Sequence, residues 1–211
     1  SDVCSSDLSR HFAMWQHPET LADTIATDLN NRFGGVHQLA ITMTGELADC
    51  FVDRGEGVDH IVRHVSSAAE KLGVRDVFFY GVDGQFRTGV QAGLEVDCVA
   101  AANWHALATF VAGDLAIHGK AVLIDVGSTT TDIIPLKDGC VATHARTDFD
   151  RMQEGSLVYV GCRRTPVCAL VQRLRFRGRE SGVMNEWFAT IDDARIVLGL
   201  QNVGRGDADT N

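Results

Sequence analysis

A strand end that carries an acidic residue and runs into a dense series of hydroxyls is the part of this sequence best suited to chemistry. Residues 125–132 read Asp-Val-Gly-Ser-Thr-Thr-Thr-Asp. Turn N–H groups, Ser/Thr hydroxyls and a glycine that allows close approach together form a concave site for an anion. The residues expected to contact the anion are Gly127, Ser128, Thr129 and Thr130. The pattern predicts a phosphate-binding loop; the alternative is a hairpin with ordinary Ser/Thr turn chemistry.

Carboxylates flank this loop on both sides. Asp125 ends the apolar run before it, and Asp132 opens the apolar run after it. A bare carboxylate would repel a phosphate, so an acidic residue beside such a site normally acts through Mg²⁺. We therefore predict that Asp125 and Asp132 are metal ligands and that Mg²⁺ is the cofactor.

A pair of basic residues offers a second anion contact in a chain with a formal net charge of -9. Arg163 and Arg164 lie in the segment Gly-Cys-Arg-Arg-Thr-Pro. Arginine binds phosphate with paired N–H groups, so a diphosphate clamp is one interpretation and a surface salt-bridge pair is the other. Four further arginines alternate along an expected strand, where a solvated edge face is the better interpretation: Arg173, Arg175, Arg177 and Arg179.

Three residues are candidates for acid–base catalysis. Glu46 and Asp49 follow a Thr-Gly turn and would share a face if a helix starts there. They are candidates for a base or a metal ligand, or alternatively for the acidic first turn of a helix. His105, beside Trp104, is a candidate base, or else a buried and hydrogen-bonded core histidine. His60 and His64 have metal-like spacing but lack the Glu of the zinc-protease motif, so we do not assign them a metal.

Apolar periodicity predicts the elements that position these groups. Helical spacing predicts helices over residues 21–32, 55–72 and 100–115, and apolar runs predict strands over residues 36–42 and 74–80. Three further strands are expected over residues 121–126, 131–136 and 140–146. Their connections are too short for a crossover helix, so they should form antiparallel hairpins. Strand–helix alternation followed by a meander indicates an α/β chain with a domain boundary near residue 120.

Composition excludes several classes of protein. Hydrophobic residues make up 45% and charged residues 22%, a globular balance. The acidic net charge argues against a nucleic-acid partner, and the absence of a run of about 18 apolar residues argues against a membrane span. Six cysteines without a CxxC pair are typical of reduced thiols, which favours a cytoplasmic protein. The sequence leaves open whether the chain forms a homo-oligomer.

Motifs along most of the chain resemble one family. They are residues 40–51, 80–84, 102–107, 124–135, 157–159, 164–170 and 184–186. In this order and spacing they are similar to the hydantoinase/oxoprolinase-like proteins of tetrahydromethanopterin-linked one-carbon metabolism, in the actin/Hsp70/sugar-kinase superfamily. The resemblance covers residues 36–200. For Glu46 and Asp49 it favours the role of a base or metal ligand over that of the first turn of a helix.

The resemblance implies a fold and an activity. The fold would be α/β, ribonuclease-H-like and of the actin/Hsp70 type, with a first lobe over residues 11–118 and a second over residues 119–211. Residues 1–10 are interpreted as non-native, and both lobes are expected to be truncated, because the first phosphate loop and an adenosine-binding segment of such folds are missing.

The implied activity is transfer of an activated aminomethylfuran group from its diphosphate to the phenol of γ-glutamyltyramine, in methanofuran-type cofactor biosynthesis. Diphosphate is released, so the expected partners are small molecules that bear diphosphate. An ATP-dependent hydantoinase/oxoprolinase-type hydrolase or small-molecule kinase is the alternative, and a regulatory nucleotide-binding module is a third. Whether ATP is used stays open.

Overall fold

The chain forms two compact units in the computed structural model, which describes residues 8–33, 35–115 and 117–200. One unit comprises residues 1–119 and 137–147, and the other residues 120–136 and 148–211. Most of the segment interpreted as non-native, and the C-terminal residues 201–211, lie outside the described residues. None of the helices in the described ranges combines the length and the apolar character that crossing a membrane would need.

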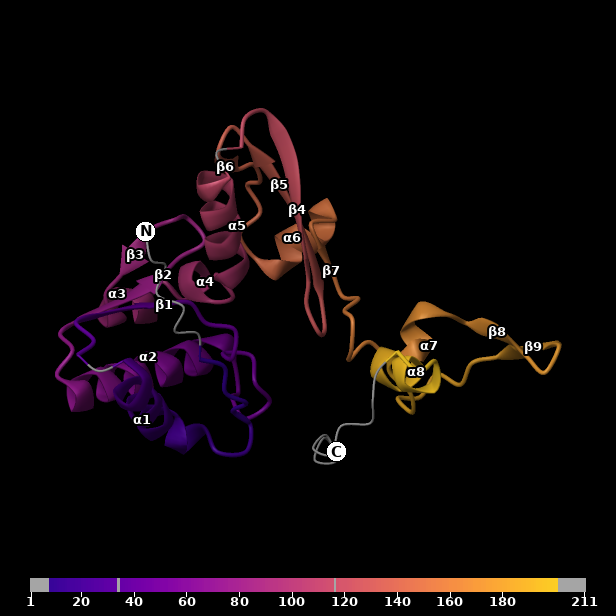
Figure 1. Ribbon diagram of the computed structural model, residues 1–211, viewed down its shortest axis with the longest axis horizontal. Helices are drawn as coiled ribbons and strands as arrows, with labels where there is room; N and C mark the ends of the chain where they lie inside the picture. The colour runs from indigo at the N-terminus through magenta and orange to yellow at the C-terminus, as the bar shows by residue number, and fades with distance from the viewer. Residues whose placement is uncertain (1–7, 34, 116, 201–211) are drawn as a thin grey trace. The chain divides into compact units, whose positions relative to one another are not determined.

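The first unit is built on a strand–helix–strand arrangement. Its elements are η1 (Pro18–Thr20), α1 (Leu21–Phe33), β1 (Gln38–Ile41), α2 (Arg54–Leu72), β2 (Asp76–Tyr80), β3 (Phe86–Arg87), α3 (Gly89–Leu94), α4 (Val96–Val99), α5 (Asn103–Asp114) and β6 (Cys140–Val141). β1 and β2 pair in parallel, and β3 pairs antiparallel with β2. Two parallel strands need a crossover between them, and α2 supplies it. In Figure 1, α1 and α2 lie on the same side of this sheet.

Helix α2 is the best-specified element of the first unit. Asp53 caps its start by accepting a hydrogen bond from the Glu56 N–H at 2.9 Å, and Gly73 ends it with a φ of 71°. Its apolar face packs against the strands in one core, which contains Val58, Ile61, Val62, Val65 and Ala69 together with Leu39 and Phe79. The predicted helix over residues 55–72 is confirmed. The burial of this face is the main stabilising term for the unit.

An ion-pair network fixes the turn between β2 and β3. Arg87, 7% exposed, donates to both oxygens of Asp83 at 2.9 and 2.8 Å and to Glu95 at 2.9 Å. The hydrogen bonds from Arg87 lower the pKa of Asp83 to about 2. A Cβ at Gly81 would lie 2.3 Å from the Arg87 guanidinium and 2.8 Å from the Asp83 carboxylate, so a larger residue there would displace the ion pair. The turn is therefore held by charge as well as by the burial of Val82, which is 1% exposed.

Gly57 on α2 sets how closely the loop that carries Glu46 approaches this helix. A Cβ at Gly57 would lie 2.0 Å from the Glu46 carbonyl oxygen, which is backbone and cannot turn aside. We expect Gly57→Ala to lower the free energy of unfolding by about 2–4 kcal/mol, as overpacked sites do. Gly93→Ala on α3 is the control: nothing lies within 4 Å of its added Cβ. In this control the free energy of unfolding should rise by about 0.5–1 kcal/mol, because alanine favours a helix more than glycine does.

Urea unfolding of both variants measures this difference. Equal effects of the two replacements would contradict the close contact between α2 and the loop.

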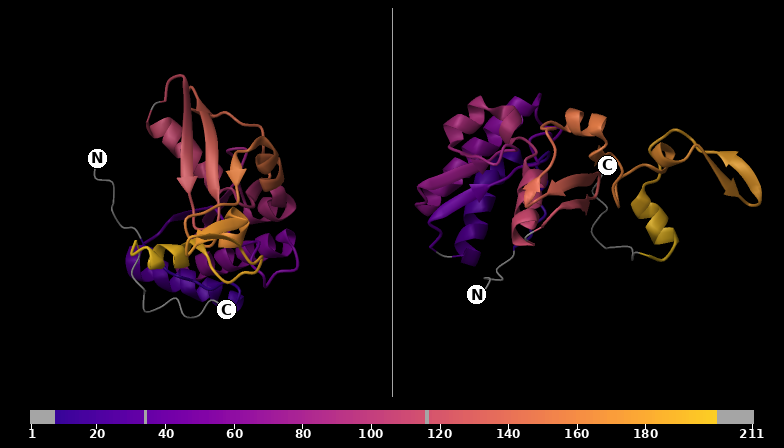
Figure 2. Two further views of the ribbon diagram at one scale, coloured as in Figure 1. Left: turned by 90° about the vertical axis from the view of Figure 1, so that its right-hand side faces the viewer. Right: turned by 90° about the horizontal axis from the view of Figure 1, so that it is seen from above.

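The second unit begins with a long β-hairpin. Its elements are β4 (Lys120–Val126), β5 (Thr131–Lys137), α6 (Asp148–Glu154), β7 (Leu157–Val158), α7 (Val167–Leu170), β8 (Arg173–Phe176), β9 (Arg179–Gly182) and α8 (Ile191–Val197). The hydrogen bond from the Gly127 N–H to the Thr130 carbonyl closes the hairpin turn. β7 pairs antiparallel with β5, matching Thr131 to Val158. Figure 2 shows the hairpin from two further sides.

The predicted meander is confirmed in part. β4 and β5 are neighbours in one sheet and are joined by a short turn, as their short connection requires. The strand predicted over residues 140–146 is wrong beyond Val141, because only Cys140 and Val141 pair. The helix predicted over residues 100–115 is also shorter, since Ala101 has a φ of 48° that no α-helix accommodates.

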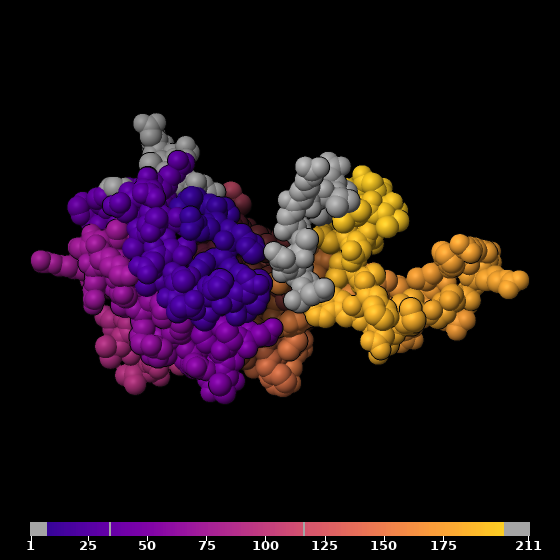
Figure 3. Space-filling view, turned by 90° about the horizontal axis from the view of Figure 1, so that it is seen from below, coloured from indigo at the N-terminus to yellow at the C-terminus, as the bar shows by residue number. Residues whose placement is uncertain are grey.

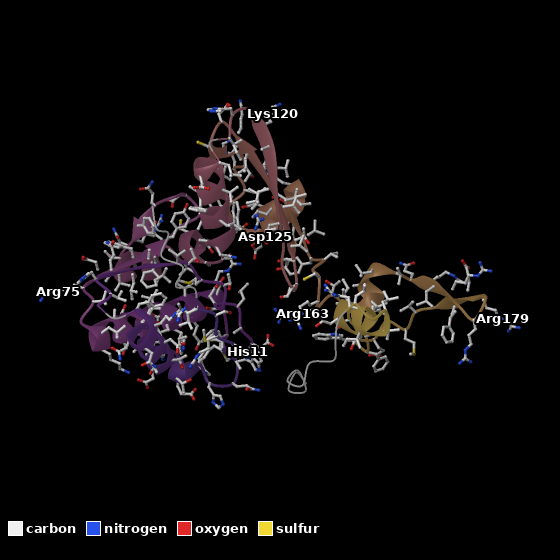
Figure 4. The ribbon with its side chains drawn as sticks, in the orientation of Figure 1. His11, Arg75, Lys120, Asp125, Arg163 and Arg179 are labelled. Atoms are coloured by element: carbon white, nitrogen blue, oxygen red, sulfur yellow. The ribbon has the colours of Figure 1, made fainter. Side chains whose placement is uncertain are left out.

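β8 and β9 form a separate hairpin with no buried residue. Its turn places Arg177 and Gly178 at φ values of 49° and 77°, the left-handed conformation that two-residue hairpin turns use. Every residue of both strands is exposed, which supports the solvated interpretation of the alternating arginines. Figure 3 shows this hairpin, in orange, as a narrow projection beside α8. Figure 4 places Arg179 at its tip.

Candidate phosphate-binding site

The loop between β4 and β5 is fastened by its carbonyl groups to residues 162–164. The Gly127 carbonyl accepts from the Cys162 N–H at 2.9 Å. The Ser128 carbonyl accepts from the N–H groups of Arg163 and Arg164 at 3.1 and 2.8 Å. The structure thus brings together the two segments that the sequence predicted as phosphate contacts.

Because the peptide group is planar and trans, each of these carbonyls fixes the direction of an N–H group. The Gly127 carbonyl shares its peptide with the Ser128 N–H, and the Ser128 carbonyl shares its peptide with the Thr129 N–H. Both N–H groups therefore point away from residues 162–164. Within residues 8–33, 35–115 and 117–200, neither N–H has an acceptor. Two adjacent, unsatisfied backbone donors are the arrangement that binds phosphate oxygens.

Gly161 makes the close approach of these segments possible. A Cβ there would lie 2.4 Å from both the Ser128 carbonyl carbon and the Thr129 nitrogen, which are backbone atoms. The Gly161 N–H donates to the Thr165 hydroxyl at 2.8 Å, and both residues are buried. Gly161 was not among the residues predicted from the sequence, although a glycine directly before the Cys-Arg-Arg segment was a usable signal.

The two arginines of this segment have different surroundings. Arg163 donates to the Asp192 carboxylate through Nε at 2.9 Å and Nη2 at 2.8 Å. Arg164 donates through Nε to the Thr129 hydroxyl at 3.0 Å. No carboxylate of the described residues pairs with Arg164. Arg164 is therefore the exposed positive charge that lies on the loop, whereas an acidic neighbour compensates Arg163.

Asp125 is the last but one residue of β4, and Val126 separates it from the loop (Figure 4). Its side chain is half-buried and, within the described residues, accepts no hydrogen bond and forms no ion pair. A partly desolvated carboxylate without a partner is costly unless a ligand compensates it. Its role as a metal ligand stays a prediction.

Asp132 is in a different situation from Asp125. Its Oδ1 accepts from Nη2 of Arg151 at 2.5 Å, and the two side chains are only 13% and 2% exposed. Arg151 also donates to the Ser156 carbonyl at 3.1 Å. In the described part of the chain, no group of three or more His, Cys, Asp and Glu side chains could hold a metal ion. The predicted metal ligands therefore comprise an unpaired Asp125 and a buried, ion-paired Asp132.

The predicted acid–base residues belong to the first unit. Glu46 is only 1% exposed, and Asp49 is exposed. The two residues lie in turns rather than on a helix, because α2 starts at Arg54, and they do not share a helical face. The alternative reading of Glu46 and Asp49 as the first turn of a helix is wrong for the same reason: Asp53 and Glu56 fill those positions.

His105 is a buried member of a hydrogen-bonded group. Its Nδ1 lies 3.0 Å from the Tyr80 hydroxyl and 3.4 Å from the Thr109 hydroxyl. Burial, with a smaller contribution from Arg146, lowers the pKa of His105, which keeps the ring neutral near pH 7. This environment is that of a hydrogen-bonded core histidine, and its role as a base stays a prediction.

The lowered pKa of His105 makes stability depend on pH. The unfolded chain gains the proton near pH 6.5, whereas the folded chain gains it only at lower pH. Stability should therefore fall as the pH drops below about 6.5 and stop falling below the folded pKa. In melts between pH 8 and 5, His105→Gln should show a shallower decline of Tm than the parent.

The control for this series is His118→Gln, because His118 is exposed and hydrated in both states. It should keep the parent slope. His60 adds to that slope, because burial lowers its pKa as well. A parental slope in His105→Gln would contradict the assigned environment of His105.

Comparison with known proteins extends over most of the chain. A family model described as hydantoinase/oxoprolinase matches residues 38–202. A protein of Methanocaldococcus jannaschii, named (4-{4-[2-(gamma-L-glutamylamino)ethyl]phenoxymethyl}furan-2-yl)methanamine synthase, is 40% identical over 188 residues, which are 89% of this chain and 54% of that protein. A Methanococcus vannielii protein of the same name is 42% identical over 82 residues, 39% of this chain and 36% of that protein. The chain spans about half the length of the first relative.

Proposed function

We propose that this chain, which belongs to the hydantoinase/oxoprolinase family, forms part of a synthase that joins an aminomethylfuran diphosphate to the phenol of γ-glutamyltyramine. The relatives carry the name of a synthase whose product contains a phenoxymethyl-furan ether. Making that ether requires a bond between a phenol oxygen and a methylene carbon. Diphosphate is a suitable leaving group for that carbon, and the step would belong to the biosynthesis of methanofuran-type cofactors.

The observation that carries this proposal is the loop whose backbone donors at Ser128 and Thr129 have no acceptor among the described residues. The N–H groups of Ser128 and Thr129 would bind the departing diphosphate, with Arg164 adding charge-assisted hydrogen bonds. As the methylene–oxygen bond breaks, its electron pair moves onto diphosphate, and these donors stabilise that charge. The phenol oxygen forms the new bond, and its proton passes to a base.

Mg²⁺ suits the residues around the loop. This ion binds through one or two carboxylates together with substrate phosphates and water, so a cage of several protein ligands is not required. Asp125 offers one carboxylate without a protein partner among the described residues. When bound, the cation would neutralise diphosphate charge, and Asp125 would hold it beside the loop.

For the base, exposure favours one of the three predicted residues. Asp49 is exposed, whereas Glu46 and His105 are 1% and 8% exposed. We propose Asp49 as the group that accepts the phenol proton. We also propose an actin-type fold with two lobes, which the parallel β1–α2–β2 arrangement and the hairpin loop support.

The test is turnover by the full-length protein. With the furanylmethyl diphosphate and γ-glutamyltyramine, diphosphate should appear only when both substrates are present, and added ATP should have no effect. Release of ADP that depends on γ-glutamyltyramine or on a lactam would instead favour the ATP-dependent kinase or hydrolase. Absence of diphosphate release with both substrates would refute the synthase.

A further inference from the structure

We propose that Asp132 is a positioning residue that acts through Arg151, and that it does not bind the metal ion. This inference rests on the proposed function, because it assigns the task of an acidic residue beside the diphosphate loop. Its basis is the ion pair between Asp132 Oδ1 and Arg151 Nη2 at 2.5 Å.

Arg151 joins the two strands that lead to the site. It lies on α6, is 1% exposed, and contacts Asp132 at the start of β5 and the Ser156 carbonyl just before β7. Ser156 returns a hydrogen bond from its N–H to the Arg151 carbonyl at 2.9 Å. A buried guanidinium held between two strands fixes their mutual position, because its donors have a rigid geometry.

The ends of these two strands form the loop and its support. β5 starts directly after Thr130, and β7 is followed by the chain that reaches residues 162–164. Next to the ion pair, the Thr131 hydroxyl donates to the Val160 carbonyl at 2.6 Å. A shift of β5 against β7 would therefore move the Ser128 carbonyl away from the N–H groups that orient the loop.

The ion pair also determines which charge the site presents. Arg151 compensates Asp132 inside the unit, so Asp132 adds no net negative charge beside the loop. Asp125 is then the remaining carboxylate that flanks the loop, and within the described residues it has no cationic partner. A site with one uncompensated carboxylate accepts a diphosphate with its cation more readily than a site with two.

The experiment compares Asp132→Asn, Arg151→Met and the double variant in the full-length protein. Amide hydrogen exchange of residues 160–165 measures the support of the loop without any ligand. Each single variant should speed this exchange at least tenfold. In the double variant, the change in the free energy of exchange should be smaller than the sum of the changes in the two single variants, because both replacements break the same ion pair. Asp59→Asn, which removes an exposed ion pair with Arg63, is the control and should leave residues 160–165 unchanged.

Titration with inorganic diphosphate separates positioning from metal binding. Asp132→Asn and Arg151→Met should both weaken diphosphate binding about tenfold and leave the Mg²⁺ concentration for half-maximal binding within twofold of the parent. The inference is overturned if Asp132→Asn raises that Mg²⁺ concentration tenfold while exchange of residues 160–165 stays normal. If the parent binds no diphosphate, the proposed function fails, and hydrogen exchange alone still decides the role of the ion pair.

Discussion

Replacing Arg164 with methionine should weaken the binding of inorganic diphosphate by about 10–100-fold. A hydrogen bond to a charged group contributes about 1.5–3 kcal/mol, and 1.4 kcal/mol corresponds to a factor of ten. Arg164 is the exposed arginine on the loop, held there by its bond to the Thr129 hydroxyl at 3.0 Å. Methionine keeps much of the apolar stem but removes the charge and the donors. Isothermal titration calorimetry with Mg²⁺ present measures the loss.

Arg163→Met is the matched control for this prediction. It removes the same kind of side chain from the neighbouring position, where the guanidinium is paired with Asp192. We expect diphosphate affinity to change less than about threefold and the Tm to fall, since the lost pair joins this segment to the start of α8. If Arg163→Met and Arg164→Met lose the same affinity for diphosphate, the loss reflects only the local positive charge, and the contact assigned to Arg164 is wrong.

Asp125→Asn should lower turnover on the order of 10²-fold or more, as the loss of a group that stabilises transition-state charge does. The amide keeps the shape of the carboxylate but removes the charge that would hold Mg²⁺. Thermal stability should stay within a few degrees of the parent or increase, because the carboxylate has no partner among the described residues. The measurement is steady-state diphosphate release at several Mg²⁺ concentrations, paired with a thermal melt.

Asp76→Asn is the control, because it makes the same replacement at an exposed strand carboxylate of the first unit. Its turnover and Tm should equal those of the parent. Near-normal turnover of Asp125→Asn across the Mg²⁺ range would end the case for a metal ligand. Loss of activity that only accompanies unfolding would assign Asp125 a structural role in the hairpin.

Sequence patterns located the loop because its chemistry is local. An apolar strand, a glycine and consecutive hydroxyls determine the hairpin between β4 and β5, and the turn N–H groups follow from backbone geometry. The pairing of this loop with residues 162–164 is not local. It depends on hydrogen bonds between segments more than thirty residues apart, which no periodicity reveals, so Gly161 went unassigned.

Burial of charged residues was the part that the sequence could not predict. Arg151 lies in an acidic, polar helix, and nothing in that pattern distinguishes it from a solvated arginine. Its burial follows from the tertiary contacts with Asp132 and Ser156. The same contacts are the reason why we interpret Asp132 as the partner of Arg151 and no longer as a metal ligand. Glu46 is comparable: its sequence context made it a candidate base or metal ligand and gave no sign of its burial. The loop that carries Glu46 packs closely on Gly57, and Glu46 is only 1% exposed.

Amide hydrogen exchange of the full-length protein, with and without saturating inorganic diphosphate and Mg²⁺, tests the central claim most directly. We expect diphosphate to slow exchange of the Ser128 and Thr129 amides, which have no acceptor in the described structure. We also expect Arg164→Met to reduce this protection at a fixed diphosphate concentration. Unchanged exchange at Ser128 and Thr129, under conditions where calorimetry shows diphosphate bound, would contradict the assignment of this loop as the phosphate site.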